Sequence, residues 1–355
     1  MKNIENKLLL FMIMFISIVT IVGFAFTKDN TYSEIENRYL SELTLETIDD
    51  YMSDHLILRN ELISFKNKFK NRIGNTLING VYVGDDDYLI PEFKTSEKKD
   101  AIIRIINDFV SKNNNVDVML VPDSYEINND KIRNKLDISE IDDINYFYRL
   151  LNSNNIDVYS SIKQENDKYN NQYYRTDHHW SGYGAYTAYK KYMSIKNMKY
   201  LDIEDFDVEE IDNFNGTSSS LAIGLSKPEK MYIFNKNNDL DVEYVYENIK
   251  TNSLYNRDYL DTKDKYATFL DNNHALIKIT NNDIDTERSI IIIKNSYANS
   301  FVPFIVNNYT NVYVVDLRYF KESTTDFIKE NKIDDILILY NLNNLYSDLS
   351  IAYLK

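Results

Sequence analysis

The sequence contains no cysteine among its 355 residues. Disulfide bonds, thiolate metal ligands, a cysteine nucleophile and a lipid anchor on cysteine are therefore all excluded. Export remains open, because a lack of disulfides does not confine a protein to a reducing compartment. Glycine (8 residues) and proline (4 residues) are scarce. Neither a glycine-rich phosphate loop nor a zinc motif occurs, so the sequence predicts no metal site and no cofactor.

Basic residues are also fewer than acidic ones. The chain has 40 Lys and Arg residues against 55 Asp and Glu residues, which gives a net charge of -15. A polyanion is bound by clustered basic side chains, and here they are dispersed. The sequence therefore argues against a nucleic acid partner. Hydrophobic residues make up 43% of the chain, which is enough to bury a core, and the length fits one large domain or two modest ones.

One uncharged and mostly apolar run, Leu8–Phe26, covers 19 residues near the N-terminus. As a helix it would span about 28 Å at about 1.5 Å per residue, close to the thickness of a bilayer core. Lys2 and Lys7 precede the run and acidic residues follow it, so the positive-inside rule places the N-terminus in the cytoplasm and the rest outside. Residues 23–27 contain no small-x-small cleavage site, which favours an uncleaved single-pass anchor in the cell membrane over a cleaved signal peptide and a secreted protein.

We therefore predict three parts: a cytoplasmic stub and transmembrane signal anchor over residues 1–27, a stalk and entry helix over 28–75, and an α/β domain over 76–355. Within the domain, short apolar strands alternate with helical patterns, which predicts a parallel sheet flanked by helices. Strands are expected at 116–122, 289–293, 312–315 and 336–340, with another near 156–159. Helices are expected at 95–114, 137–153, 185–196, 298–308 and 323–331. Residues 200–285 are less regular and form either an insertion or a β-rich cover over the sheet.

Four histidines, His55, His178, His179 and His274, are the candidates for a general base with a pKa near neutrality. His179 stands two residues after Asp177, so both side chains face the same way in an extended segment. An aspartate beside an imidazole fixes the tautomer of the ring and stabilises its charged form. An N-cap before a helix is the competing interpretation of this pair.

A second polar stretch, Lys294–Phe301, follows the apolar strand at 289–293 and precedes a helical pattern. Active sites of α/β sheets lie at the carboxyl ends of strands, and helix N-terminal amides there stabilise an oxyanion. Ser296 is therefore the candidate nucleophile, with a plain N-cap serine as the alternative. Ser300 is less favoured, because it falls one turn into the helix.

Three further side chains are candidates for contact with the substrate or the oxyanion. Asn295 directly precedes Ser296, and Arg318 and Tyr319 follow the strand at 312–315. Arg318 and Tyr319 are predicted to donate hydrogen bonds into the same crevice. An ordinary ion pair between Asp316 and Arg318 is the equally weighted alternative.

The string Asp-His-His-Trp at 177–180 is the signature of the DHHW family, which is similar to the alginate O-acetyltransferase proteins with their rearranged SGNH hydrolase domain. Other elements follow in the family's order, among them Glu36–Leu40 near the beginning and Phe214–Thr217, an instance of Phe-x-Gly-Thr/Ser. The resemblance covers nearly the whole exported part of the chain. It implies an SGNH hydrolase-like arrangement of the predicted sheet.

Carried over residue by residue, the resemblance assigns Asp177, His179 and Ser296 to a catalytic triad, with His178 as the intervening residue. The sequence departs from the family at Asn295, where an aspartate is usual. Asparagine keeps a similar shape and hydrogen-bonding capacity but carries no charge.

The function implied by the resemblance is transfer of an acyl group, in the first place acetyl, to hydroxyl groups of a cell-surface or secreted polysaccharide. A membrane-bound O-acyltransferase would supply the acyl group from the cytoplasmic side. Two alternatives stay open. With water as the acceptor, the same residues would make a carbohydrate esterase, and a chain without activity would bind glycan or scaffold a polysaccharide export complex.

Overall fold

The computed structural model describes residues 7, 10, 11, 14 and 31–355 of the chain. The predicted membrane anchor, Leu8–Phe26, lies outside the described residues except for Leu10, Phe11 and Met14. Within the described part, no helix is long and apolar enough to cross a membrane. The anchor therefore stays a prediction from the sequence.

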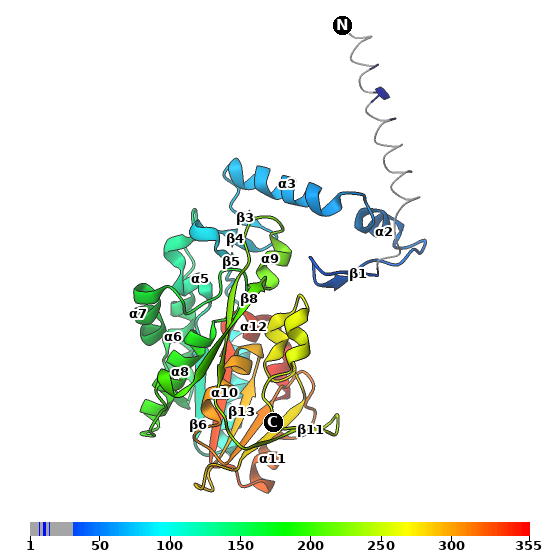
Figure 1. Ribbon diagram of the computed structural model, residues 1–355. Coiled ribbons are helices and arrows are strands. Elements are labelled where there is room, and N and C mark those ends of the chain that lie inside the picture. The colour runs from blue at the N-terminus through cyan, green and yellow to red at the C-terminus, as the bar shows by residue number, and fades with distance from the viewer. Residues whose placement is uncertain (1–6, 8–9, 12–13, 15–30) are drawn as a thin grey trace.

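The molecule is organised around an eight-stranded sheet (Figure 1). In spatial order its strands are β11 (Ile249–Thr251), β10 (Leu240–Tyr244), β12 (Leu276–Asn281), β14 (Asn311–Val315), β13 (Ser289–Lys294), β15 (Asp335–Asn341), β6 (Val116–Val121) and β7 (Asn154–Asn155). The five strands from β14 to β7 run parallel, and β12, β10 and β11 extend the β14 edge in antiparallel pairing. The predicted parallel sheet is confirmed in its central part, and the sheet as a whole is mixed.

Strands β13 and β15 lie inside the sheet because their sequences are apolar on both faces. Every residue of both strands is buried. Alternate residues of β13 face two separate hydrophobic clusters, with Ile290 and Ile292 on one side of the sheet and Ile291 and Ile293 on the other. This alternation follows from the two-residue period of a strand and requires helices on both faces.

Helices cover both faces of the sheet, as the alternating pattern predicts. The cluster of Ile291 and Ile293 is covered by α4 (Lys99–Lys112), α6 (Glu140–Leu150), α11 (Thr324–Glu330) and α12 (Leu342–Ser347). The cluster of Ile290 and Ile292 is covered by α7 (Tyr159–Tyr169), α8 (Gly182–Ile195) and α10 (Val302–Ile305). The shorter helical segments are α5 (Ser124–Ile127), η1 (Asp85–Asp87), η2 (Asn129–Lys131), η3 (Ile203–Asp205), η4 (Arg257–Asp261), η5 (Lys265–Thr268), η6 (Ser296–Ser300) and η7 (Leu349–Tyr353).

Residues 200–285, predicted as an insertion or a cover, divide into two structures. β8 (Asp207–Phe214) and β9 (Glu229–Asn235) form a separate antiparallel pair, with α9 (Thr217–Leu221) between them. The later residues supply the antiparallel strands β10, β11 and β12 of the main sheet. β10 buries only alternate residues, which is the pattern of a strand with one solvated face.

The strand predicted near 156–159 is shorter and lies earlier in the chain, as β7. The Asp157 side chain accepts a hydrogen bond from the Tyr159 amide at 2.9 Å. Such a side chain-to-backbone bond favours a turn over an extended strand, so α7 already begins at Tyr159.

The region predicted as a stalk and entry helix forms, from residue 31 onward, β1 (Tyr32–Ser33), β2 (Arg38–Tyr39), α2 (Ile48–Asp54) and α3 (Arg59–Arg72). Asp54 holds these elements together, because it accepts a hydrogen bond from Arg38 at 3.0 Å and pairs with Arg59 at 3.4 Å. A small sheet of β3 (Leu77–Ile78), β4 (Val81–Val83) and β5 (Leu89–Pro91) follows. β5 contacts α5, which follows the carboxyl end of β6, so this end of the molecule carries the carboxyl ends of the parallel strands (Figure 1).

Candidate active site

The carboxyl ends of three neighbouring parallel strands converge on one polar cluster. Ser296 comes two residues after the end of β13, Asp123 two residues after the end of β6, and Asn341 is the last residue of β15. Parallel strands end at the same edge of a sheet, which is where α/β proteins place their sites. The edge predicted from the sequence is therefore the edge at which these polar residues meet.

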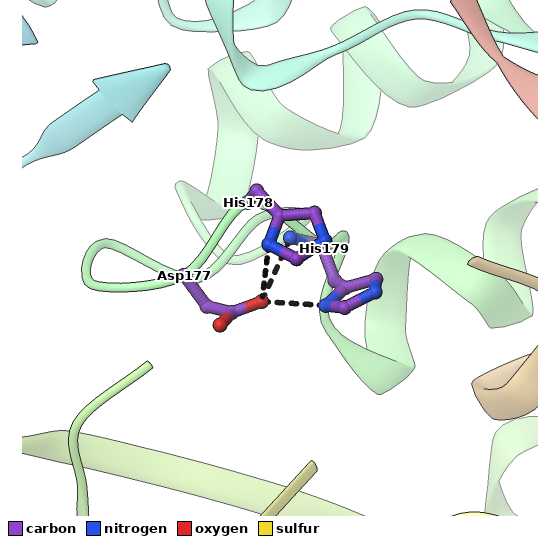
Figure 2. A group of neighbouring side chains, drawn as sticks. All are labelled: Asp177, His178 and His179. Atoms are coloured by element: carbon purple, nitrogen blue, oxygen red, sulfur yellow. Dashed lines mark hydrogen bonds and ion pairs between the residues drawn. The ribbon is translucent and has the colours of Figure 1, made fainter. Parts of the chain in front are cut away.

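The structure brings together the three residues predicted as a triad. His179 Nε2 lies 2.7 Å from Ser296 Oγ, and His179 Nδ1 lies 2.6 Å from Asp177 Oδ1. Figure 2 shows Asp177 and the two histidines on the loop before α8. Asp177 is 1% exposed and His179 is 4% exposed, while Ser296 is half-buried. The imidazole thus connects a buried carboxylate to an accessible hydroxyl, as a general base must.

The Asp177 carboxylate is held in its ionised form. Burial alone would raise its pKa, but the imidazoles of His178 and His179 and hydrogen bonds from His179 and the Thr217 amide outweigh burial and hold the pKa of Asp177 well below its usual range. The Thr217 amide donates to Oδ2 at 2.7 Å, and the His179 amide donates to Oδ1 at 2.9 Å. The carboxylate therefore has a fixed orientation toward the ring of His179.

Gly216 allows this contact with Thr217. A Cβ atom at Gly216 would lie 2.2 Å from Asp177 Cβ, closer than side chains can approach. The Phe-x-Gly-Thr element at 214–217 thus has a physical reason. The glycine admits the aspartate, and the following amide donates to it. The sequence indicated this element only through the resemblance to the family.

His178 lies between Asp177 and Thr217, with its Nδ1 3.7 Å from Asp177 Oδ1 (Figure 2). Its Nδ1 lies 2.7 Å from Thr217 Oγ1, and its ring lies over His179 with 3.8 Å between the centroids. Burial and the neighbouring His179 lower the pKa of His178 to about 4, so the ring is neutral at neutral pH. His178 is therefore a neutral side chain beside the site.

The same three side chains are the one group in the described part of the chain with the composition and spacing of a metal site. Ligand atoms of Asp177, His178 and His179 lie within 4.8 Å of one another (Figure 2). Both nitrogens of His179 are engaged, one by Asp177 and the other by Ser296. The donors thus satisfy one another within the protein, and the cluster fits a hydrogen-bonded relay better than a metal centre.

The turn that carries Ser296 is fixed from both sides. Asn295 is its N-cap, and its Oδ1 accepts a hydrogen bond from the Tyr297 amide at 3.2 Å. Trp180 Nε1 donates to the Tyr297 carbonyl and to Ser300 Oγ, each at 2.9 Å. The less favoured candidate, Ser300, is therefore buried against Trp180. The single tryptophan joins the histidine loop to the serine turn.

Tyr266 is a site residue that the sequence did not reveal. Its ring stacks on His179 with 3.8 Å between the centroids and an angle of 8° between the planes. Its hydroxyl donates to the Ser296 carbonyl at 3.1 Å. The residue lies in the irregular region 200–285, and nothing in the local pattern distinguishes it from the other tyrosines.

A second buried aspartate lies on the other side of the serine turn. Asp123 Oδ1 accepts hydrogen bonds from the Tyr297 hydroxyl at 2.9 Å and from Asn341 Nδ2 at 2.6 Å. Asn341 Oδ1 in turn accepts from Asn295 Nδ2. Burial raises the pKa of Asp123. Asn341 therefore links Asn295 to the carboxyl group of Asp123 by hydrogen bonds.

Arg318 and Tyr319 form a separate group. Arg318 Nε and Nη2 bind Asp316 at 2.9 and 2.5 Å, and Lys294 Nζ lies 3.3 Å from the same carboxylate. The ion-pair alternative for Asp316 and Arg318 is thus present. Among the described residues, no contact joins Arg318 or Tyr319 to Ser296, and their role as donors stays a prediction.

Two cavities open beside the polar cluster. One of about 580 Å³ is lined by polar and aromatic residues, including His178, Asp123, Thr217, Asn341, Asn343 and Tyr346. The other, of about 1060 Å³, lies between the β1–β2 hairpin and the loops near 213–226 and 259–264, and its lining includes Lys263. The lining of the first cavity includes His178 and Thr217, both of which contact Asp177.

Comparison with known proteins connects this site to a family. The sequence profile of the family described as DHHW protein matches residues 49–315. No curated protein matches the chain. A DHHW family protein from Eubacterium siraeum has a similar structure over 78% of this chain and 95% of its own, at 24% identity and a TM-score of 0.67. PatB1 from Bacillus cereus, solved with a sulfonyl adduct, is similar over 78% of this chain and 98% of its own, at 22% identity and a TM-score of 0.66. At these identities the likeness shows a shared fold.

Proposed function

The chain belongs to the DHHW protein family, and on this premise we propose that it transfers an acyl group through Ser296 to a hydroxyl group of an extracytoplasmic polysaccharide. The observation that carries the proposal is the continuous path of hydrogen bonds from Asp177 through His179 to Ser296, at 2.6 and 2.7 Å. The family resemblance points to O-acetyltransferases, and acetyl is therefore the acyl group that we favour.

The chemistry follows from the roles of the three side chains. His179 Nε2 removes the proton from Ser296 Oγ as that oxygen attacks the carbonyl carbon of the acyl donor, and the imidazolium then protonates the leaving group. A sugar hydroxyl next gives its proton to His179 Nε2 and attacks the carbonyl carbon of the acyl-serine. The bond from that carbon to Ser296 Oγ breaks, and the imidazolium returns the proton to Ser296 Oγ, which leaves the acylated sugar and the free serine. Asp177 stays ionised throughout and holds the ring in the tautomer that accepts a proton at Nε2.

The cavity beside His178 is the proposed acceptor site. Its lining combines hydroxyl, amide and aromatic groups, including Thr217, Asn343 and Tyr346, which suits the hydroxyl groups and apolar faces of sugars. The acyl donor would be handed over by a membrane-bound O-acyltransferase, with the domain on the outer side of the membrane. Both this partner and this location follow from the resemblance and the predicted anchor.

Hydrolysis is the alternative reaction of the same three residues, with water in place of the sugar. The non-catalytic alternative gains weight from Asn295, the residue that departs from the family. In the structure, Asn295 caps the serine turn, and Ser296 retains its contact with His179. The geometry therefore favours an active protein over a scaffold.

The test uses the full-length protein in detergent with 4-nitrophenyl acetate as the donor. We expect acetate release that accelerates when an oligosaccharide acceptor is added, together with O-acetylated oligosaccharide in the mass spectrum. Acetate release without sugar acetylation would indicate the esterase. An aryl sulfonyl fluoride should add its sulfonyl group to Ser296 and block both reactions. Ser296→Ala should lack activity and labelling, and wild-type turnover in that variant would overturn the proposal.

A further inference from the structure

The helix α3 exposes an apolar face. Three large hydrophobic side chains within the helix and one at each of its two caps are exposed, from 51% for Leu62 to 71% for Phe65. They are Leu58, Leu62, Phe65, Phe69 and Ile73. The spacing of three or four residues places them on one side of the helix. Further exposed apolar side chains precede them, among them Leu43, Leu45, Ile48 and Met52.

The opposite side of α3 contacts the domain through polar groups. Asn67 is 2% exposed, and its Nδ2 donates to the Ile223 carbonyl at 3.2 Å. Ser64 lies against Gly224, where a Cβ atom would come within 2.0 Å of the serine hydroxyl. A helix on a water-soluble domain normally buries its apolar stripe and exposes its polar side. Here the orientation is reversed, and an apolar surface of this kind marks a face that meets another apolar phase.

The basic residues of α3 indicate what this apolar phase is. α3 carries five basic residues and one acidic residue, in a chain whose net charge is -15. At 3.6 residues per turn, Lys66 and Lys70 fall on one side of the apolar stripe, and Lys68 and Arg72 fall on the other. Basic side chains bordering an apolar stripe on both sides are typical of a helix that lies in the interface of a membrane with anionic lipids.

The position of α3 agrees with a membrane. The predicted anchor, Leu8–Phe26, precedes this region in the chain, so an anchored chain would keep α3 close to the bilayer. We infer that the apolar face of α3 lies in the headgroup region of that bilayer, with its basic residues against anionic lipids. This inference does not depend on the chemistry proposed for Ser296.

One consequence concerns the site. Ile223, the contact of Asn67, closely follows α9, and Thr217 at the start of α9 donates to Asp177. The membrane-facing helix is thus connected by a short segment to the site edge of the sheet. If the proposed function holds, this arrangement directs the site toward the membrane from which the acyl group is supplied.

The absence of cysteine allows a direct test in the full-length protein. A single cysteine replaces Phe65 and carries an environment-sensitive fluorophore, and the protein is reconstituted in liposomes of phosphatidylglycerol and phosphatidylcholine. We expect blue-shifted emission that brominated lipids quench, most strongly when the bromines lie at the shallow depth of about 5–10 Å typical of interfacial helices. Ile249→Cys in β11 is the matched control, because Ile249 is also an exposed hydrophobic residue and β11 lies at the far end of the molecule from α3 (Figure 1).

The outcomes separate the possible occupants of this face. Emission from position 65 as water-exposed as that from position 249 would overturn the inference. A blue shift that lipid bromines do not quench, and that grows with the protein-to-lipid ratio, would assign the face to a second copy and would also overturn it. Loss of the shift in purely neutral liposomes would support the role of Lys66 and Lys70. Ester turnover should match wild type in both labelled variants, because neither position belongs to the proposed site. A wild-type protein without ester turnover would contradict the proposed function and would leave this inference unaffected.

Discussion

Two buried aspartates, Asp177 and Asp123, flank the same serine turn, and their pKa values move in opposite directions. Asp177 accepts hydrogen bonds from an imidazole ring and from two backbone amides. The neighbouring imidazoles and these hydrogen bonds hold its pKa well below the usual range despite its burial. Burial raises the pKa of Asp123, whose Oδ1 meets a tyrosine hydroxyl and an asparagine amide.

Burial alone therefore does not decide what an aspartate does. Ionised Asp177 is directed at the ring that takes the serine proton, and its charge is part of the proposed chemistry. Asp123 is directed at Tyr297 and Asn341, which hold the turn, so its hydrogen-bonding shape matters more than its charge. The family's usual aspartate at position 295 is asparagine here, and hydrogen bonds through Asn341 link this asparagine to the carboxyl group of Asp123.

The largest expected effect follows the replacement Asp177→Asn. An asparagine offers an NH₂ group where the His179 ring needs an acceptor, so the ring adopts the wrong tautomer. We expect turnover of 4-nitrophenyl acetate to fall by about 10³–10⁴-fold. Ser296→Ala provides the baseline, and unchanged thermal unfolding would show that the fold is intact. A loss smaller than tenfold would mean that the charge of Asp177 is not needed, and the contrast with Asp123 would disappear.

The second-largest effect is expected at Gly216, where the lack of a side chain leaves room for Asp177. In Gly216→Ala, the new methyl group would overlap Asp177 Cβ, and the carboxylate must move away from His179. A displacement of about 1 Å costs on the order of 10²-fold in rate, and we expect a loss of that size in turnover. Ser220→Ala in α9, the helix that follows Gly216, is the control and should be near wild type, because the Ser220 hydroxyl makes no hydrogen bond to any described residue. Equal activity of the two variants would contradict the proposed contact.

Asp123→Ala should have a moderate effect. The substitution removes the acceptor of Tyr297 and Asn341 and loosens the serine turn, and we expect turnover to fall by about tenfold. Asp123→Asn keeps one acceptor oxygen and should lose less. The comparison with Asp177→Asn is made in one assay. If Asp123→Asn were as damaging as Asp177→Asn, Asp123 would be a second essential charge.

A smaller effect concerns stability and pH. Burial raises the pKa of Glu140, whose carboxylate accepts the Asp123 amide at 2.9 and 3.0 Å, well above the usual value. Between the unfolded pKa of about 4.3 and the raised folded value, the folded protein binds more protons than the unfolded chain, so stability falls as the pH rises. Glu140→Gln should reduce the fall in melting temperature between pH 5 and pH 8, by about 2–4 °C. Parallel curves for the two proteins would show that Glu140 is ionised in the folded state.

The smallest effect is expected at the position that departs from the family. Asn295 Oδ1 caps the Tyr297 amide, and an aspartate can do the same, so Asn295→Asp should change turnover by less than tenfold. The new carboxylate would compete with Asp123 for the Asn341 amide. The double variant Asp123→Asn with Asn295→Asp removes that competition and should match wild type. A tenfold rise in the single variant, about 1.4 kcal/mol of barrier, would mark the natural protein as a low-activity form.

Local sequence pattern was sufficient to predict the central strands and the residues that stand next to the ends of strands and helices. The strands β13 and β15 are apolar on both faces, which predicts their place inside a parallel sheet. Ser296 follows such a strand, and Asp177 and His179 stand two residues apart before a helix. Their meeting could be predicted, because strand ends and helix starts gather at one edge of an α/β sheet.

The partners of these residues could not be predicted in the same way. Tyr266 binds the Ser296 carbonyl from 30 residues away, and the Tyr297 hydroxyl reaches Asp123 across 174 residues. Neither contact follows from spacing, since each depends on which strands become neighbours. The exposed face of α3 is a similar case, because an amphipathic pattern does not reveal which side of a helix meets the domain.

The central strands, the serine turn and the Asp177–His179 pair could therefore be predicted from local sequence, because short-range periodicity and motif chemistry act within a few residues. Tertiary structure alone decided that β6 lies beside β15 and β15 beside β13. That order brings Asp123, Asn341 and Asn295 into one hydrogen-bonded row behind Ser296. The physical reason is that burial and hydrogen-bond partners set the ionisation of a carboxyl group, and both are properties of the folded neighbourhood.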